Sequence, residues 1–128
     1  MKKYTLGDLQ TAIMRELWQH GELSSAEVTE ALRAERGLAP TTIATMLTKL
    51  EKKGVVTHRQ EGRRYLYRAL VSEDDVRRSM VTELTERLFE GNAAALVSHL
   101  IEENQLDRNE LDRIENLIAR HGTEDGND

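Results

Sequence analysis

Residues 40–54 read PTTIATMLTKLEKKG, and residues 55–67 read VVTHRQEGRRYLY. The first stretch has apolar side chains at helical spacing and stops at Gly54, whereas the period changes from 3.6 to 2 in the second, as in a β-hairpin. The turn of this hairpin carries Arg63 and Arg64. A helix followed directly by a basic-tipped hairpin is typical of a winged helix-turn-helix. In that arrangement the helix lies in the major groove of DNA, and the hairpin reaches the backbone or the neighbouring minor groove.

The predicted helix over residues 40–53 has two different faces. At about 100° per residue, the inward face carries the apolar side chains of Ile43, Met46, Leu47 and Leu50. The outward face carries hydroxyl and ammonium groups, from Thr41, Thr42, Thr45, Thr48, Lys49 and Lys52. Threonine is β-branched and lowers helix propensity, so this many threonines on one exposed face indicate a function. Their hydroxyls can hydrogen-bond to base edges and phosphates, and their methyl groups can contact thymine.

The predicted DNA-binding residues are therefore the six polar residues of this helix and the two arginines of the turn, Arg63 and Arg64. Arginines at such a tip can bind phosphates or enter a narrow minor groove. The alternative interpretation is a helix surface that is merely polar beside a hairpin that is merely solvated. Tyr65 and Tyr67 alternate with Leu66 on the second strand, and we expect them to pack the hairpin against the domain.

Charge is distributed unevenly along the chain, whose net charge is −5. Residues 1–70 contain 12 basic and 8 acidic side chains, whereas residues 71–128 contain 6 and 15. The stretch from Lys49 to Arg68 holds seven basic residues against two acidic ones. A basic first part and an acidic second part are typical of a protein that binds nucleic acid with one face.

Start and stop signals predict further helices over residues 8–20, 25–36, 73–90, 93–103 and 108–121. Capping boxes mark the starts at Ser24 and Asp107, and a weaker version marks Ser72. Ala39 is a poor cap for the helix that begins at Pro40, although proline suits the first helical position.

The strands of the hairpin are predicted over residues 55–59 and 64–69, with a third short strand around Leu23. The fold class that follows is mainly α. We expect a winged helix-turn-helix domain over residues 1–71, a helical dimerisation domain over residues 72–121 and a disordered tail over residues 122–128.

The last three predicted helices carry more apolar surface than their own small core can use. Such unpaired apolar stripes indicate a second copy of the chain as partner. The predicted dimerisation residues are the apolar positions of these stripes: Val76, Met80, Leu84, Leu88, Leu96, Leu100, Leu111, Ile114, Leu117 and Ile118.

Composition excludes several classes of protein. The chain has no cysteine, which excludes disulfides and thiolate metal sites and fits the reducing cytoplasm. No apolar run approaches the roughly 18 residues of a membrane span. The four histidines have no ligand spacing, and no nucleophile–base pattern or glycine-rich phosphate loop is present. We therefore expect neither a metal nor a cofactor, and no enzymatic activity.

Two other functions remain open at this point. A winged-helix module that binds only proteins should show exposed apolar anchors in place of the threonine face and the basic hairpin. A regulator of the multidrug-regulator type that senses a small molecule would need a roomy pocket beside the dimerisation helices. The apolar stripes give no sign of a pocket lined by polar groups.

Several segments match a known family in order and spacing. They are Leu6-Gly7-Asp8-Leu9-Gln10, Met14, Leu17-Trp18, residues 40–50, Lys53-Gly54, and Glu61-Gly62-Arg63 followed by Tyr65 and Tyr67. With these residues the chain resembles the penicillinase-repressor (BlaI/MecI) family of bacterial winged-helix regulators, over about Leu6 to Arg120.

The resemblance implies a homodimer that is held by its C-terminal helices, sits on a palindromic operator and blocks transcription. Carried over by position, Thr42, Thr45, Thr48 and Lys49 would read or clamp the operator, and Arg63 and Arg64 would be wing contacts. It also implies a regulatory protease, which in the family's resistance repressors cuts an Asn-Phe bond.

Two positions depart from the family pattern. His99-Leu100 stands at the cleavage bond, and Ala44 stands where relatives often carry a basic side chain. The cysteine pair of copper-responsive relatives is absent.

Overall fold

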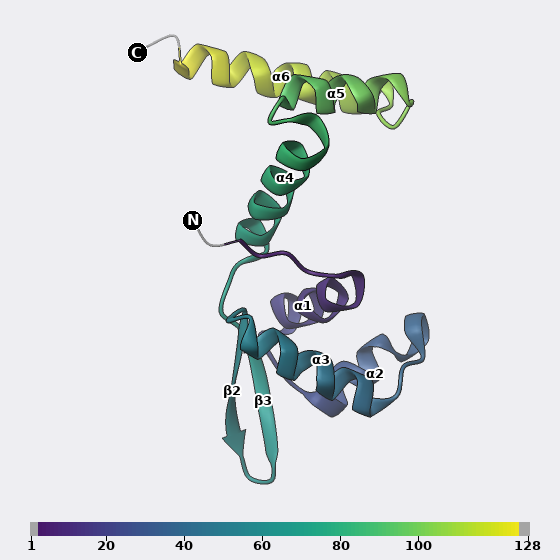
Figure 1. Ribbon diagram of the computed structural model, residues 1–128, viewed down its shortest axis with the longest axis vertical. Helices are drawn as coiled ribbons and strands as arrows, with labels where there is room; N and C mark the ends of the chain where they lie inside the picture. Colours follow the sequence, from purple (N-terminus) through teal and green to yellow (C-terminus); the bar gives the residue numbers. More distant parts are fainter. Residues whose placement is uncertain (1–2, 126–128) are drawn as a thin grey trace. The chain divides into compact units, whose positions relative to one another are not determined.

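The computed structural model describes residues 3–125, with side chains from Lys3 to Gly122. Two compact units, residues 1–83 and 84–128, divide the chain. The elements in chain order are α1 (Asp8–His20), β1 (Glu22–Ser24), α2 (Ser25–Arg36), α3 (Pro40–Lys52), β2 (Val56–Glu61), β3 (Arg64–Ala69), α4 (Glu73–Phe89), α5 (Ala93–Glu102) and α6 (Arg108–Asp125) (Figure 1). The expected fold class, mainly α with a winged helix-turn-helix, is confirmed.

The first unit has an antiparallel sheet in the order β1-β3-β2. Register pairs Leu23 with Tyr67 on one side of β3 and His58 with Tyr67 on the other, so the third strand predicted around Leu23 is confirmed. The hairpin of β2 and β3 projects past α3 (Figure 1). The two strands of the hairpin stay paired as far as Glu61 and Arg64. Strand β2 therefore ends two residues later than the predicted end at residue 59. Gly62, with φ of 63°, explains the difference, because it permits a two-residue turn where we expected four residues.

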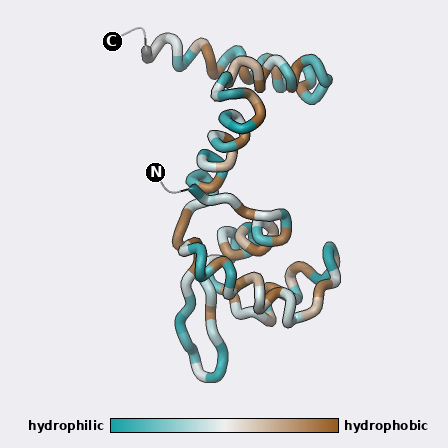
Figure 2. The backbone as a smooth tube through the Cα atoms, viewed as in Figure 1, coloured by the Kyte–Doolittle hydropathy of each residue, from teal (hydrophilic) through white to brown (hydrophobic). Residues whose placement is uncertain are grey.

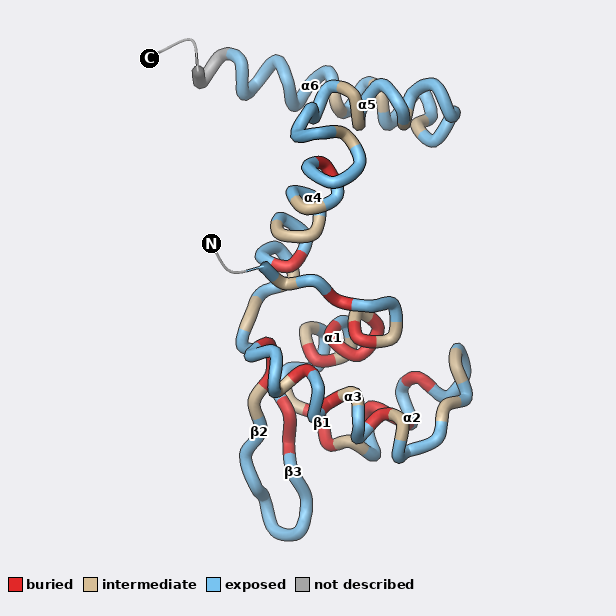
Figure 3. The backbone as a smooth tube through the Cα atoms, viewed as in Figure 1, coloured by how far each residue is buried: buried red, intermediate tan, exposed pale blue. Residues whose placement is uncertain are grey.

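The core of the first unit lies between the three helices and the sheet (Figure 3). Its fully buried side chains come from α1, α2, α3 and the start of the hairpin: Ile13, Met14, Leu17, Val28, Ile43, Leu47, Leu50, Val55 and Val56. Met46, expected inward, is half-buried and packs against this core. The indole Nε1 of Trp18 donates a hydrogen bond of 2.9 Å to the carbonyl oxygen of Val71, which fixes the chain just before α4.

Helix starts follow the capping signals. The hydroxyl of Ser24 accepts a hydrogen bond from the N–H of Glu27 at 3.1 Å, and the carboxylate of Glu27 accepts one from the N–H of Ser24 at 2.9 Å. Asp107 and Glu110 make the same reciprocal pair, and Ser72 accepts from the N–H of Asp75. These contacts confirm the three predicted caps. Each such cap stabilises its helix by about 0.5–2 kcal/mol. Cap residues are therefore a usable sequence signal for the start of a helix.

The second unit contains the end of α4 together with α5 and α6. Figure 2 shows hydrophobic stretches along these helices, yet among their described side chains α5 and α6 have no buried residue (Figure 3). Helix α6 continues to Asp125, four residues beyond its predicted end. Gly122 did not stop it because glycine costs a helix only about 1 kcal/mol unless it adopts the left-handed conformation, as Gly37 does. Residues 122–125 of the expected tail thus lie in α6, residues 126–128 lie outside the described residues, and disorder of this tail stays a prediction.

Candidate nucleic-acid interface

The outward face of α3 is built as the sequence predicted. Ile43, Leu47 and Leu50 point into the core, and this fixes the rotation of the helix. Five of the six polar residues are exposed, namely Thr41, Thr45, Thr48, Lys49 and Lys52. Thr42 is half-buried because it lies at the border of the face, directly before Ile43. One helix thus presents a row of hydroxyl and ammonium groups to solvent.

The threonines of this face differ in their free hydrogen-bonding capacity. The hydroxyl of Thr48 donates to the carbonyl oxygen of Ala44 at 3.0 Å, so its oxygen remains available only as an acceptor. No hydrogen bond within the described residues engages the hydroxyls of Thr41 and Thr45. These two can therefore both donate and accept, which suits either a base edge or a phosphate oxygen.

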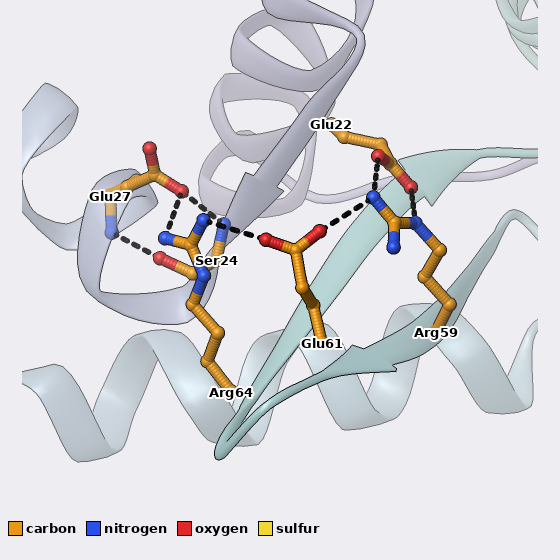
Figure 4. Close-up of polar contacts among 6 residues, drawn as sticks. All are labelled: Glu22, Ser24, Glu27, Arg59, Glu61 and Arg64. Carbon is orange, nitrogen blue, oxygen red and sulfur yellow. Dashed lines mark hydrogen bonds and ion pairs between the residues drawn. The ribbon is translucent and has the colours of Figure 1, made fainter.

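The arginines of the hairpin have different surroundings. Arg59 forms two hydrogen bonds with Glu22, at 2.8 and 2.9 Å, and one with Glu61 at 3.0 Å. Arg64 lies 3.4 Å from Glu61 and 3.5 Å from Glu27, measured between guanidinium nitrogen and carboxylate oxygen. Figure 4 shows Glu61 between the two arginines, and Glu27 joining Arg64 to the cap of α2. The hairpin is thereby fixed to β1 and α2.

The contacts among Glu22, Glu27, Arg59, Glu61 and Arg64 shift the pKa values of several of these groups. The hydrogen bond from Arg59, aided by its charge, lowers the pKa of Glu22. The backbone and hydroxyl hydrogen bonds from Ser24 lower the pKa of Glu27. The carboxylates of Glu22 and Glu61 raise the pKa of Arg59. Glu22 and Glu27 therefore stay ionised, and the carboxylates around Arg59 and Arg64 offset the charges of these arginines.

Fewer basic side chains are free to bind DNA than the count of basic residues suggested. Arg63, at the tip, is exposed, and within the described part of the chain no hydrogen bond or ion pair engages it. Lys49 and Lys52 are likewise exposed on α3. Lys53, which belongs to the same basic run, instead donates to the carbonyl oxygen of Thr5 and to the side chain of Gln10. These pairings could not be predicted, because the partners lie far away along the chain.

An open groove of about 450 Å³ separates the end of α3 from the hairpin. It is lined by Thr48, Glu51, Lys52, His58, Tyr65 and Tyr67. His58 Nδ1 lies 2.6 Å from a carboxylate oxygen of Glu51, and the ring of His58 lies 4.6 Å from that of Tyr65. Tyr67 packs the hairpin on the domain as expected, and its burial raises its pKa, whereas Tyr65 is 49% exposed. His58 was not among the predicted site residues. Its place in this groove follows from the register of the hairpin, which pairs His58 with Tyr67.

The predicted dimerisation residues divide into three groups. Val76 is buried in the core of the first unit, and Met80 packs against that core, so these two serve the fold of their own chain. Four of the others are exposed: Leu84, Leu88, Leu117 and Ile118. The remaining four are half-buried: Leu96, Leu100, Leu111 and Ile114. Val81, Val97 and Ile101 add exposed apolar surface that the prediction left out.

Two features are absent from the described residues. No group of three or more histidine, cysteine, aspartate or glutamate side chains comes together there as a metal site would require. No helix in that part of the chain has the length and hydropathy needed to cross a bilayer.

Known proteins similar to this chain were found by sequence. A family model described as penicillinase repressor matches residues 6–120. The penicillinase repressor of Bacillus licheniformis is 29% identical over 122 residues, which cover 94% of this chain and 95% of that protein. The transcriptional regulator BlaI of Mycobacterium tuberculosis is 34% identical over 130 residues, which cover 99% of this chain and 93% of that protein.

Solved structures give similarities to the first part of the chain. The solution structure of the DNA-binding domain of the repressor BlaI has a TM-score of 0.52 and 36% identity, and the match covers 59% of this chain and 93% of that one. The monomeric form of Bacillus licheniformis BlaI, in complex with the blaP half-operator, has a TM-score of 0.50 and 34% identity, with coverage of 58% and 90%.

Proposed function

The chain belongs to the penicillinase repressor family of DNA-binding transcriptional regulators, and we propose that it represses transcription as a homodimer on a palindromic operator. One observation carries the proposal. The hydroxyl- and ammonium-bearing face of α3 is exposed next to a hairpin whose tip residue, Arg63, is not engaged by any described group. This pairing suits a helix in the major groove and a wing on the backbone. Such an activity belongs in the cytoplasm, where a bacterial chromosome lies.

Each side chain of the interface has a distinct role in this proposal. Thr41, Thr42 and Thr45 contact base edges or phosphates, and Thr48 accepts a hydrogen bond or contacts a thymine methyl. Lys49 and Lys52 bind phosphates and supply attraction that does not depend on sequence. Arg63 is the main wing contact. Arg64 contributes less, because Glu27 and Glu61 compete for its guanidinium.

Homodimer formation is supported by the apolar side chains that the second unit leaves in solvent. Leu88 is 65% exposed and Ile118 is 66% exposed. A second copy of the chain would cover such surface, and a two-fold dimer matches the symmetry of a palindrome. Joining two DNA-binding units makes the second contact effectively intramolecular, so the dimer binds a full operator far more tightly than a half-site.

A winged-helix module that binds only proteins is less well supported. Its binding surface should present large apolar anchors. The outward face of α3 carries none, because its exposed residues are threonines, lysines and Ala44. The open groove between α3 and the hairpin is lined by residues of α3, β2 and β3 alone, so it does not supply the pocket formed with dimerisation helices that a multidrug-type sensor would need.

A regulatory protease remains part of the proposal. His99 and Leu100, which stand at the family's cleavage bond, lie inside α5. Proteases bind extended backbone, so cleavage there requires local unfolding of the helix. Mass spectrometry of protein recovered from induced cells would show two fragments that meet at this bond if the cut occurs, and intact chain if it does not.

Selection of bound fragments from genomic DNA of the source organism, with the purified full chain, tests the main proposal. We expect recovered fragments to share an inverted repeat, and sedimentation of the complex to show two chains on each repeat. Recovery of fragments without a common motif, or one chain on a lone half-site, would contradict a dimeric repressor. Thr45→Ala then tests the interface, since loss of a base contact lowers discrimination more than general affinity.

A further inference from the structure

Residues 4–6 connect α3 and α4, two elements that are not neighbours in sequence. Leu6 is buried in the core, and Tyr4 packs against it half-buried. The N–H of Tyr4 donates to the hydroxyl of Ser79 at 2.8 Å, and the hydroxyl of Thr5 donates to the carboxylate of Glu83. Ser79 and Glu83 are four residues apart on α4 and therefore lie on one face of that helix. The segment before α1 thus holds two successive turns of α4.

The other side of the same segment is held by the end of α3. The ammonium group of Lys53, the residue that caps α3, donates to the carbonyl oxygen of Thr5 at 2.8 Å. It also donates at 3.0 Å to the side-chain oxygen of Gln10, a residue that is 8% exposed. That oxygen accepts a second hydrogen bond from the N–H of Gly7 at 3.1 Å. Lys53 is therefore part of a fixed internal network, although it lies beside Lys52 and Lys49 in sequence.

From these contacts we propose that residues 4–6 and Lys53 fix the direction of α4 relative to α3, and so set the half-site spacing that the dimer accepts. The inference rests on the proposed function, and it names which residues make the dimer selective. Helix α4 leaves the first unit after Glu83 and contributes Leu84 and Leu88 to the surface proposed for dimerisation. The direction in which α4 leaves each DNA-binding unit then determines how far apart the two α3 helices lie.

Packing alone leaves this direction weakly defined. Val76 and Met80 anchor the first turns of α4 on the core, but apolar contact is not directional. Hydrogen bonds to Ser79 and Glu83 are directional, and the bond to Glu83 lies beyond both apolar anchors, three residues after Met80. A small rotation about the anchored end therefore breaks them before it uncovers much apolar surface.

The test compares full-length native protein with the double variant Thr5→Val, Ser79→Ala. The two changes remove the side-chain contacts to α4 and leave the bond between Lys53 and the Thr5 carbonyl in place. Duplexes carry one half-site or two half-sites whose separation varies by single base pairs. We expect affinity for the best-spaced duplex to fall by about tenfold, as loss of one to two hydrogen bonds would give, and half-site affinity to stay within about twofold.

A second variant distinguishes a structural role of Lys53, through its hydrogen bonds to Thr5 and Gln10, from a direct contact between Lys53 and DNA. Lys53→Gln should lower affinity for the best-spaced duplex without changing the salt dependence of half-site binding. A phosphate contact at Lys53 would instead reduce the salt slope by about one. Thr5→Ser keeps the hydroxyl and should restore native spacing preference, while Thr82→Val, an exposed change on α4, should have no effect.

The outcomes distinguish this inference from the function on which it rests. Native spacing preference in the double variant, or an equal loss on half-sites and full sites, overturns the inference alone. A reduced salt slope for Lys53→Gln also overturns it. A native chain that binds none of the duplexes overturns the proposed function and the inference together.

Discussion

The first unit of the chain buries most of its large apolar side chains, whereas none of the described large apolar side chains of the second unit is buried. Ile13 and Leu47 are 0% exposed, but Leu88 is 65% exposed and Ile118 is 66% exposed. Each unit contains helices with side-chain caps, α2 in the first and α5 and α6 in the second, so the contrast does not come from local structure. It teaches that the first unit completes its core within one chain, and that α4 to α6 carry surface suited to another copy. A second contrast concerns charge at the hairpin: Arg59 and Arg64 have acidic partners, whereas no described residue pairs with Arg63.

The largest effect is expected in the core of the first unit. Leu47→Ala should lower the free energy of unfolding by about 2–5 kcal/mol, because it leaves a cavity among fully buried side chains. Urea unfolding at low protein concentration measures it. Ile118→Ala is the matched change in the second unit and should cost less than about 0.5 kcal/mol under the same conditions. Equal losses at the two positions would break the contrast between the units.

The second-largest effect is expected on the affinity of the dimer. Leu88→Asp places a charge on apolar surface that a partner would bury, and the dimer dissociation constant should rise by about a hundredfold. Sedimentation at micromolar concentration measures this constant. Thr82→Asp adds the same charge at a polar position of α4 and should leave it unchanged. A Leu88→Asp variant that remains dimeric would remove this residue from the interface.

The paired and unpaired arginines should differ by a smaller amount. Arg63→Gln should reduce operator affinity by about tenfold and the salt slope by about one, because one phosphate contact is lost. The double variant Arg64→Gln, Glu61→Gln keeps the net charge and should retain nearly the native slope. Fluorescence anisotropy at several salt concentrations measures both. An unchanged slope for Arg63→Gln would place the wing outside the interface.

The smallest effect concerns the pH dependence of stability. Contact with Arg59 holds the pKa of Glu22 below its ordinary value of 4.5. A lowered pKa in the folded state stabilises the protein above the unfolded value, and this contribution is lost as pH falls through the folded value. Glu22→Gln should therefore flatten the decline of the thermal midpoint below about pH 5, with the exposed Glu115→Gln as control. Parallel curves for native protein and Glu22→Gln would mean that the pair contributes nothing.

Helix positions were predictable because their signals are local. The cap at Ser24 and the left-handed glycine at Gly37 enclose α2, and both lie within a few residues of the groups they satisfy. The outward face of α3 followed from the positions of its buried residues, since a helix has only one rotation that buries them. The end of α6 was missed because Gly122 has the residue type of a stop without its conformation.

Charge pairing could not be predicted, since it depends on tertiary contact. Lys53 meets Thr5 across a sequence separation of 48, and Arg59 meets Glu22 across 37. Counting basic residues between Lys49 and Arg68 overestimated the cations available to DNA, because the count cannot tell which of them are already engaged by carboxylates, a carbonyl oxygen or an amide oxygen of the fold. Glu51 and His58 were missed for the same reason, as only the packed hairpin brings them together.

Cancellation of charge by Glu61 has a consequence for recognition along the operator. With Arg59 and Arg64 offset, positive charge near the turn of the hairpin is concentrated at Arg63. In the complex that we propose, the wing therefore samples the potential of the duplex at one location per half-site. That potential is most negative where an A-tract narrows the minor groove. We therefore expect a preference for A·T-rich flanks, at base pairs beyond the reach of α3, produced by the shape of the DNA and not by hydrogen bonds to its bases.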